Sequence, residues 1–228
     1  MNTDRLQLIF NSLQRCFGPR HWWPADSGFE VAVGAILTQN TAWTNVEQAI
    51  DNLRSAAALS PAALCQLTPA ELEALIRPAG FFRQKTRSLH EFTACLLNHY
   101  DGNMSTLCSG PLDAARRRLL AIRGIGPETA DSILLYAANR PTFVVDAYTR
   151  RIFARLGLLQ GRESYAAIRS MFMEALPAEA SLYNEYHALI VAHAKTYCRK
   201  RQPLCKDCPL LRHCPYGQSI RYEARELC

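Results

Sequence analysis

Residues 116–137 read RRRLLAIRGIGPETADSILLYA, and this stretch decides the fold. An apolar helical pattern ends at Gly124-Ile125-Gly126, and Pro127 stands where a second helix is expected to begin. Glycine accepts positive φ angles and lets another group come close to the backbone. The stretch therefore predicts two helices joined by a tight turn. The free N–H groups at the start of the second helix form a cradle for an anion such as a DNA phosphate, without base readout.

The rest of the chain also has helical periodicity. Thr68-Pro69 is a capping residue followed by a proline at the first helical position. Strand patterns are nearly absent, and the one short candidate is PTFVV at 141–145. The sequence therefore predicts an all-α protein. The expected helices lie at about 3–17, 28–39, 43–57, 69–76, 84–98, 112–121, 127–138, 146–156, 163–175 and 181–195.

Composition and charge indicate where the protein is located and what kind of partner it binds. No apolar run reaches the roughly eighteen residues that a membrane span needs. The N-terminus alternates polar and apolar residues at helical spacing, unlike a secretory signal, so we expect a cytoplasmic protein, associated with the nucleoid if bacterial. The formal net charge of +6 is modest, but arginines cluster near the motifs, at 116–118, 150–151 and 199–201. This distribution favours a polyanionic partner.

Four of the nine cysteines lie within residues 198–214, CRKRQPLCKDCPLLRHC. The pair Cys205-x-x-Cys208 has chelate spacing, and Cys198 and Cys214 complete a set of four. Thiols stay reduced in the cytoplasm, which favours metal binding over disulfides. Structural zinc and a [4Fe–4S] cluster both accept four thiolates, and the residues alone leave this choice open.

An acidic residue, Asp146, follows the apolar run that ends at Val145. It is placed to cap the helix expected over 146–156. A carboxylate at this point can also have a chemical role, and the two roles are compatible.

Together these motifs resemble the helix-hairpin-helix signature of the DNA glycosylase superfamily, with its Gly/Pro-rich loop and aspartate. The match runs from LLAIRGIGPETA (119–130) through RPTFVVDAYTRRI (140–152). The cysteine spacing, and HALIVAHAKTYC at 187–198 before it, resemble the iron–sulfur loop of the endonuclease III family. The resemblance covers nearly the whole chain.

The resemblance implies a fold of two helical lobes. A six-helix barrel with the hairpin would span 25–139, and residues 1–24 and 140–228 would form a helical iron–sulfur domain. It implies a [4Fe–4S] cluster held by Cys198, Cys205, Cys208 and Cys214. It also implies a monomer that binds double-stranded DNA with a damaged base and turns this base out into a pocket.

One departure from the family pattern bears on the chemistry. Bifunctional members carry a lysine just before the Thr-Ala of the second helix, where this chain has Glu128. Glutamate cannot attack the sugar as an amine, so we expect a monofunctional glycosylase in which Asp146 stabilises the oxocarbenium-like sugar. A second departure is Arg123, where the family hairpin usually has proline.

The WWP stretch, LTQNT followed by x-aromatic, and GIG-x-E-(S/T)-AD resemble most closely the endonuclease III-like 3-methyladenine DNA glycosylases. N-alkylated purines are cationic and stack well between aromatic faces. By resemblance, a base pocket is assigned to Trp22, Trp23, Pro24, Trp43, Glu128 and Lys195. DNA contacts are assigned to Gln39, Asn40, Arg83, Lys85, Arg123, Gly124, Gly126 and Thr129.

Three other functions stay open from the sequence. The enzyme could release a deaminated or mismatched base such as uracil, thymine or hypoxanthine. The chain could be a DNA-structure binder without catalysis, although Asp146 argues against this. A regulator held together by zinc fits the sequence least well.

Overall fold

The computed structural model describes residues 2–20, 22–23 and 25–226. All regular secondary structure in these ranges is helical, which confirms the predicted fold class. The chain divides into two compact units. The terminal unit comprises the residues up to Trp22 and those from Thr142 on, and the central unit comprises Trp23–Pro141.

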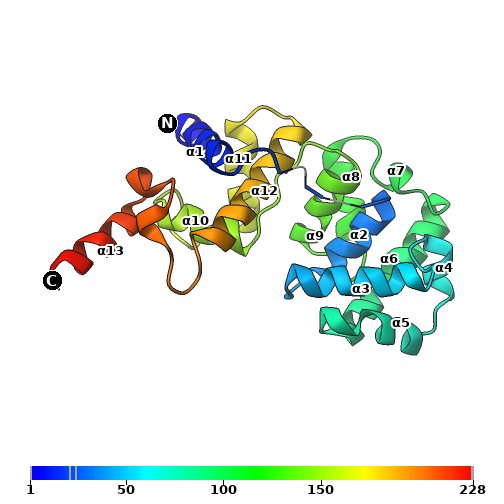
Figure 1. Ribbon diagram of the computed structural model, residues 1–228. Coiled ribbons are helices and arrows are strands. Elements are labelled where there is room, and N and C mark those ends of the chain that lie inside the picture. The colour runs from blue at the N-terminus through cyan, green and yellow to red at the C-terminus, as the bar shows by residue number, and fades with distance from the viewer. Residues whose placement is uncertain (1, 21, 24, 227–228) are drawn as a thin grey trace. The chain divides into compact units, whose positions relative to one another are not determined.

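The central unit is built around one apolar helix (Figure 1). Helix α2 (Gly28–Leu37) is buried from Phe29 to Leu37, so apolar neighbours surround it, and it contacts α3, α6, α9 and η2. The other helices are α3 (Trp43–Ser55), α4 (Pro61–Gln66), α5 (Pro69–Ile76), η1 (Arg77–Ala79), α6 (Phe82–Tyr100), α7 (Met104–Leu107), α8 (Leu112–Leu120), α9 (Pro127–Ser132) and the π-helical η2 (Ile133–Ala137).

Local signals fix several helix starts in this unit. Thr68 caps α5 in a full capping box with Glu71, and proline stands in the first turn of α4, α5 and α9. The buried faces of these helices form one core that includes Ile36, Phe92 and Leu119.

The terminal unit consists of α1 (Asn2–Phe17), α10 (Ala147–Arg155), α11 (Tyr165–Ala175), α12 (Ala180–Thr196), η3 (Cys205–Asp207), η4 (Leu211–His213) and α13 (Pro215–Glu226). Helix α12 contacts both α1 and α10 (Figure 1). Aromatic rings fill the core: Phe143 stacks on Phe172 with centroids 3.8 Å apart, and Tyr186 meets both edge-on.

Three α-helices have no counterpart among the sequence predictions, α4, α7 and α13, and neither do the short 3₁₀ helices η1, η3 and η4. Helices α4 and α7 have six and four residues, too short to show periodicity. The predicted strand candidate at 141–145 is not a strand. It has no regular secondary structure, its residues Thr142–Val145 are buried, and it leads directly into Asp146.

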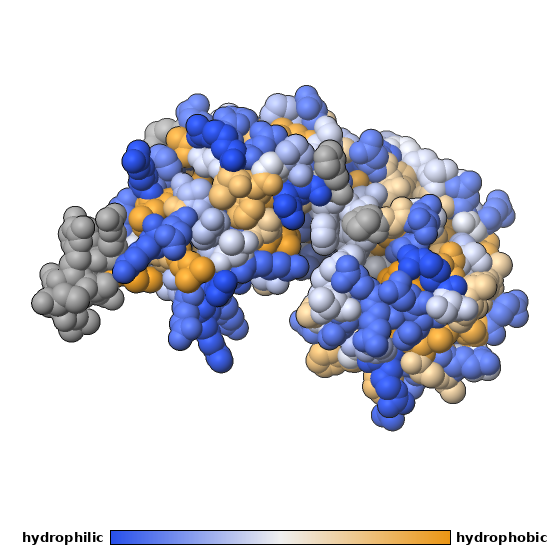
Figure 2. Space-filling view, in the orientation of Figure 1, coloured by the Kyte–Doolittle hydropathy of each residue, from blue (hydrophilic) through white to orange (hydrophobic). Residues whose placement is uncertain are grey.

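The visible surface is mainly hydrophilic, with small hydrophobic patches between the polar side chains (Figure 2). Among the described residues, no helix combines the length and apolar character needed to cross a membrane.

Candidate functional site

The hairpin turn is packed closely against α6. Gly124 has φ of 90°, which a residue with a side chain rarely adopts. A Cβ at this position would lie 2.7 Å from the Cβ of Ser88 on α6. Ile122 and Ile125, on either side of the glycine, are buried in the core of the central unit. Burial and this close approach therefore hold the turn in place.

Gln39 connects the end of α2 to the hairpin. Its Nε2 donates to the carbonyl oxygen of Gly124 at 3.2 Å and to the hydroxyl of Thr129 at 3.1 Å. The structure thus brings together three of the residues assigned to DNA contact. Thr129 is only 4% exposed, however, so its side chain supports Gln39 and does not face a phosphate, contrary to the prediction. Gly126 has open space around its Cα.

Lys85 is also placed differently from the prediction. Its side chain is buried, and Nζ donates to the carbonyl oxygens of Leu37 and Ala79, each at 2.8 Å. Burial lowers the pKa of Lys85 to about 8. The assigned phosphate contact is therefore wrong, because the ammonium instead satisfies carbonyls at the ends of α2 and η1.

The other predicted DNA contacts of the central unit lie at its surface. Arg83, Arg123 and Asn40 are exposed, and Asn40 is left-handed with φ of 54°. Phe81, which was not among the predicted site residues, is 65% exposed and left-handed with φ of 46°. An exposed aromatic ring on a strained backbone calls for a functional explanation. The sequence feature that could have indicated it is the pair of phenylalanines directly after Gly80.

Asp146 caps α10 as predicted from the sequence. Its Oδ1 accepts the backbone N–H of Thr149 at 2.7 Å and the Thr149 hydroxyl at 2.8 Å, while Oδ2 lies 3.6 Å from Nε2 of His187. Burial opposes ionisation, but the nearby His187, together with the bonds from Thr149, keeps the pKa of Asp146 below its usual value. Nothing in the sequence indicated His187, because this residue lies on α12, far from Asp146 along the chain.

A cavity of about 390 Å³ lies within the central unit between α2 and α3. Trp23 and Trp43 meet edge-to-face in it, with centroids 4.7 Å apart, and Tyr136 packs on Trp23. A Cβ at Gly34 would lie 3.0 Å from the Trp23 ring, so the absence of a side chain at Gly34 allows the indole to pack against α2. The lining comprises Trp23, Gly34, Trp43 and Ile50, with Glu30, Glu47, Asp51 and Arg54.

The carboxylates of this cavity were not predicted. Glu30 is buried, and its Oε1 accepts Arg54 Nη2 at 2.8 Å; Arg54 also pairs with Asp51 at 2.5 Å. With Glu47 the lining carries three carboxylates and one guanidinium. This negative balance beside two indoles suits a planar organic cation.

The remaining residues assigned to the base pocket are not in this lining. Glu128 is exposed in the first turn of α9, and Lys195 is exposed in the last turn of α12. Trp22 is half-buried in the terminal unit. Pro24 lies outside the described residues.

The four clustered cysteines line one pocket in the terminal unit. Burial and then mutual repulsion of the thiolates raise the pKa of Cys208 to about 11, although a backbone N–H opposes this. Arg155 Nη1 and the backbone N–H of Gly217 donate to Cys198 Sγ and Cys214 Sγ, both at 3.3 Å. A Cβ at Gly217 would lie 3.1 Å from Cδ1 of Leu211, so the glycine allows α13 to begin close to η4. Over the described ranges, no three His, Cys, Asp or Glu side chains converge on a single metal-ion position.

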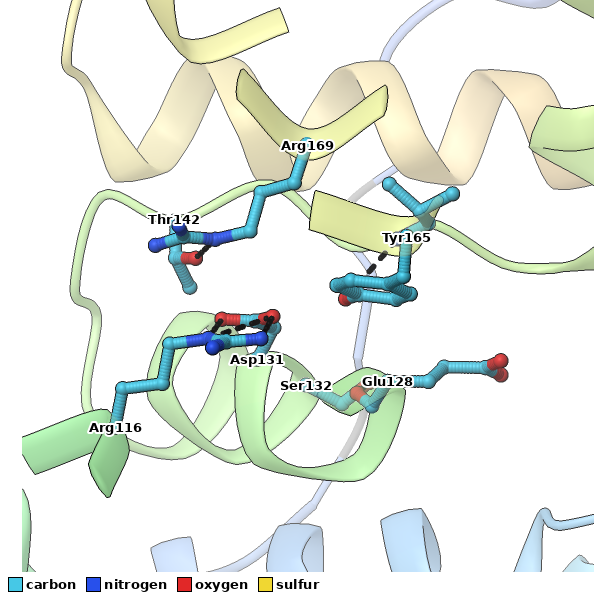
Figure 3. A network of polar contacts seen from close by, with 8 residues as sticks. Arg116, Glu128, Asp131, Ser132, Thr142, Tyr165 and Arg169 are labelled. Carbon is cyan, nitrogen blue, oxygen red and sulfur yellow. Dashed lines mark hydrogen bonds and ion pairs between the residues drawn. The ribbon is translucent and has the colours of Figure 1, made fainter. Parts of the chain in front are cut away.

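Several arginines of the basic clusters serve the fold. Nε and Nη2 of Arg116 donate to the buried carboxylate of Asp131, each at 3.0 Å. Figure 3 shows the two side chains facing each other. Arg118 donates to the carbonyls of Leu107 and Ser109. Charge clusters in the sequence therefore overstate the surface that is free to meet a polyanion.

Comparison with known sequences gives concordant matches. The model of the HhH-GPD superfamily base excision DNA repair protein matches residues 33–178. A Methanocaldococcus jannaschii protein, named provisionally as DNA repair glycosylase MJ1434, is 45% identical over 92% of this chain and 96% of its own. Endonuclease III of Thermotoga maritima is 27% identical over 82% of this chain and 83% of its own.

Solved structures agree in fold. An endonuclease III trapped as a covalent intermediate with DNA aligns with a TM-score of 0.84 at 22% identity, covering 96% of this chain and 98% of that one. The 3-methyladenine DNA glycosylase of H. pylori, bound to 1,N6-ethenoadenine, aligns with a TM-score of 0.73 at 25% identity, covering 85% and 97%.

Proposed function

Because the chain belongs to the HhH-GPD superfamily of base excision DNA repair proteins, we propose that it is a monofunctional glycosylase for N-alkylated purines such as 3-methyladenine. The family makes it a base excision repair DNA glycosylase. The finer proposal is that it acts as a monomer, in the cytoplasm or on the bacterial nucleoid. Its substrate is double-stranded DNA with one damaged base, and it hydrolyses the N-glycosidic bond without cutting the strand.

The geometry of Asp146 carries this proposal. Its pKa is held below the usual value, so the carboxylate is ionised at neutral pH. When the bond from C1′ to the base nitrogen breaks, both electrons leave with the base and positive charge develops on the sugar. A fixed carboxylate stabilises this charge until water adds to C1′ and loses a proton. A cationic alkylpurine departs as a neutral base and needs no general acid.

The absence of a suitable amine supports the monofunctional assignment. The lysines of the chain are Lys85, Lys195, Lys200 and Lys206, and the hairpin position has Glu128. Lys85 is buried with its ammonium on two carbonyls. A Schiff base with the sugar, which strand cleavage by β-elimination requires, therefore lacks its nucleophile near the hairpin.

The aromatic cavity supports an alkylated purine as the substrate. Its indoles offer stacking surface, and its carboxylates outnumber its one guanidinium. The H. pylori protein of similar fold was solved with an alkylated adenine, 1,N6-ethenoadenine.

The central unit carries the residues that we propose to contact DNA. Arg83 and Arg123 are exposed cations suited to phosphates, and the open backbone at Gly126 allows a phosphate to approach. Phe81 presents an apolar ring of the kind that enters between base steps. Gln39 is held beside the turn by Gly124 and Thr129.

The cysteine pocket fits a [4Fe–4S] cluster. Thiolates around one zinc ion must all lie about 2.3 Å from it, whereas those of a cluster bind separate iron atoms. Four cysteines that share one pocket, with Arg155 and a backbone N–H donating to two of the sulfurs, support the cluster. When bound, it would cross-link the loop of residues 198–214 through Cys198, Cys205, Cys208 and Cys214, and no step of base release passes through it.

A panel of duplexes, each with one lesion, tests the activity. Products are scored with and without alkali. We expect release of N-alkylated purines, with strand breaks only after alkali. Breaks without alkali would refute the monofunctional assignment. Release of uracil, thymine or hypoxanthine alone would refute the alkylpurine substrate.

Asp146→Asn tests the residue. Asparagine caps helices as well as aspartate, so the variant should fold and bind DNA. We expect base release to fall by at least about 100-fold. Asp113→Asn, at an exposed position on α8, is the matched control and should keep wild-type turnover.

A further inference from the structure

The two carboxylate oxygens of Asp146 have different partners. Oδ1 accepts both hydrogen bonds from Thr149 and is committed to capping α10. Oδ2 faces Nε2 of His187 at 3.6 Å. Oδ2 is therefore the oxygen left for a reacting sugar, and the group beside it influences its direction and its charge.

His187 has little freedom to move. It is 7% exposed on α12, and this helix contacts both α1 and α10. The hydroxyl of the adjacent Tyr186 donates to the carbonyl oxygen of Leu6 on α1 at 2.9 Å, which ties the two helices together next to the imidazole. The helix pair thus presents the imidazole to Asp146 in a fixed position.

Several charged and polar side chains on α1, α10, α11 and α12 have hydrogen bonds to groups other than Asp146. Donors to backbone carbonyls are Arg5 to Leu156, Arg150 to Glu163, Arg151 to Cys198 and Arg155 to Arg199. Glu185 accepts the N–H of Arg20, the Tyr165 hydroxyl accepts the N–H of Val145, and Arg169 donates to the Thr142 hydroxyl. His187 is the ionisable side chain that the structure places against Oδ2.

We propose that His187 is a positioning residue, whose buried ring nitrogen Nε2 holds Oδ2 of Asp146 in its direction during base release. The proposal rests on the proposed function, since it takes Asp146 as the reacting carboxylate. His187 itself need not touch the substrate.

Two effects of His187 can be separated by pH. The contact of Nε2 with Oδ2 at 3.6 Å restricts the direction of the carboxylate. The charge of His187 also lowers the pKa of Asp146, against the effect of burial. Removal of the charge should therefore move the acid limb of the pH–rate profile to higher pH.

Single-turnover base release by His187→Gln and His187→Leu, measured across pH, tests the inference. Glutamine keeps an N–H donor at similar reach but cannot be charged, and leucine removes both. At neutral pH we expect His187→Leu to be slower by about tenfold, and His187→Gln to recover most of the rate. Both variants should have an acid limb at higher pH than the wild type.

The controls make each outcome decisive. In both His187 variants, the affinity for an abasic-site duplex and the thermal unfolding midpoint should stay close to those of the wild type. His99→Gln, exposed on α6, should leave the profile unchanged. If the acid limb of the His187→Gln profile lies at the same pH as that of the wild type, the inference is wrong. This comparison holds even if His187→Leu does not fold. Wild-type turnover in Asp146→Asn would instead overturn the proposed function, so the two failures are distinguishable.

Discussion

The hairpin around Gly124 and the cysteine loop at 198–214 are both turns between helices, yet they are held in opposite ways. In the hairpin, Ile122 and Ile125 enter the core and Gly124 lies against α6. Of residues 198–214, all of which the structure describes, Leu210 alone is buried. The hairpin is fixed by its own packing, whereas the loop brings together thiolates that repel one another.

The contrast shows what each region requires to work. A turn that presents its backbone to phosphate must be rigid without help, because a bulky side chain or a bound group would block the approach. A basic loop with few apolar residues gains little order from burial, so we propose that a bound group supplies the order. The comparison can be tested from both sides.

Loss of a cysteine ligand should have the largest effect. Structural metal sites contribute on the order of 10 kcal/mol to the folding of small metal-held domains. In Cys208→Ala we expect amides of residues 198–214 to lose measurable protection from hydrogen exchange, while those of the hairpin keep theirs. Cys65→Ala, exposed on α4, is the control. Full protection of the loop in Cys208→Ala would show that burial is enough.

Gly124→Ala should break the hairpin from the other side. The new Cβ would meet Ser88, and φ of 90° would be strained. We expect the free energy of unfolding to fall by about 2–4 kcal/mol, measured by denaturant titration. Gly126→Ala is the matched control, because open space surrounds that position. Equal stability of the two variants would contradict the packing described for the turn.

Gln39→Ala removes two hydrogen bonds to the hairpin without touching its core. We expect a loss of about 1 kcal/mol in the free energy of unfolding. Gln48→Ala, exposed on α3, should be neutral. If the two variants have the same stability, Gln39 does not brace the turn.

The smallest effect concerns Lys85 and pH. Burial lowers its pKa to about 8 from 10.5, so between these values the unfolded chain holds a proton that the folded protein has lost. Stability should therefore rise with pH in this window. The bonds to two carbonyls favour the charged ammonium, so we expect a rise below about 1 kcal/mol. Lys85→Met should lack the rise, and an identical pH dependence in both proteins would contradict the assignment.

Local signals explain why the fold could be predicted from the sequence. Thr68-Pro69 and Pro127 mark helix starts within a few residues, and the structure begins α5 and α9 at the prolines. Helix α13 was missed because the region has few apolar residues, although Pro215 stands at its start as in the other helices. The segment at 141–145 resembles a strand in sequence because Thr142–Val145 are all buried. A short apolar run of this kind does not distinguish a buried strand from another buried segment.

The candidate site could be predicted only where a residue acts within its own segment. Gly124 and the cap at Asp146 follow from neighbouring residues. The burial of Lys85 and the contact of His187 with Asp146 depend on helices far apart in the chain. The arginine clusters misled for the same reason, since a composition count does not show that Arg116 binds a buried aspartate.

Borohydride trapping tests most directly the claim that a carboxylate severs the glycosidic bond without an amine. The wild-type protein is incubated with duplex containing an alkylated purine and sodium borohydride, and released base and protein–DNA adduct are measured in the same samples. The account predicts released base with no adduct, because borohydride fixes only a Schiff base. An adduct that accumulates in step with base release would contradict it.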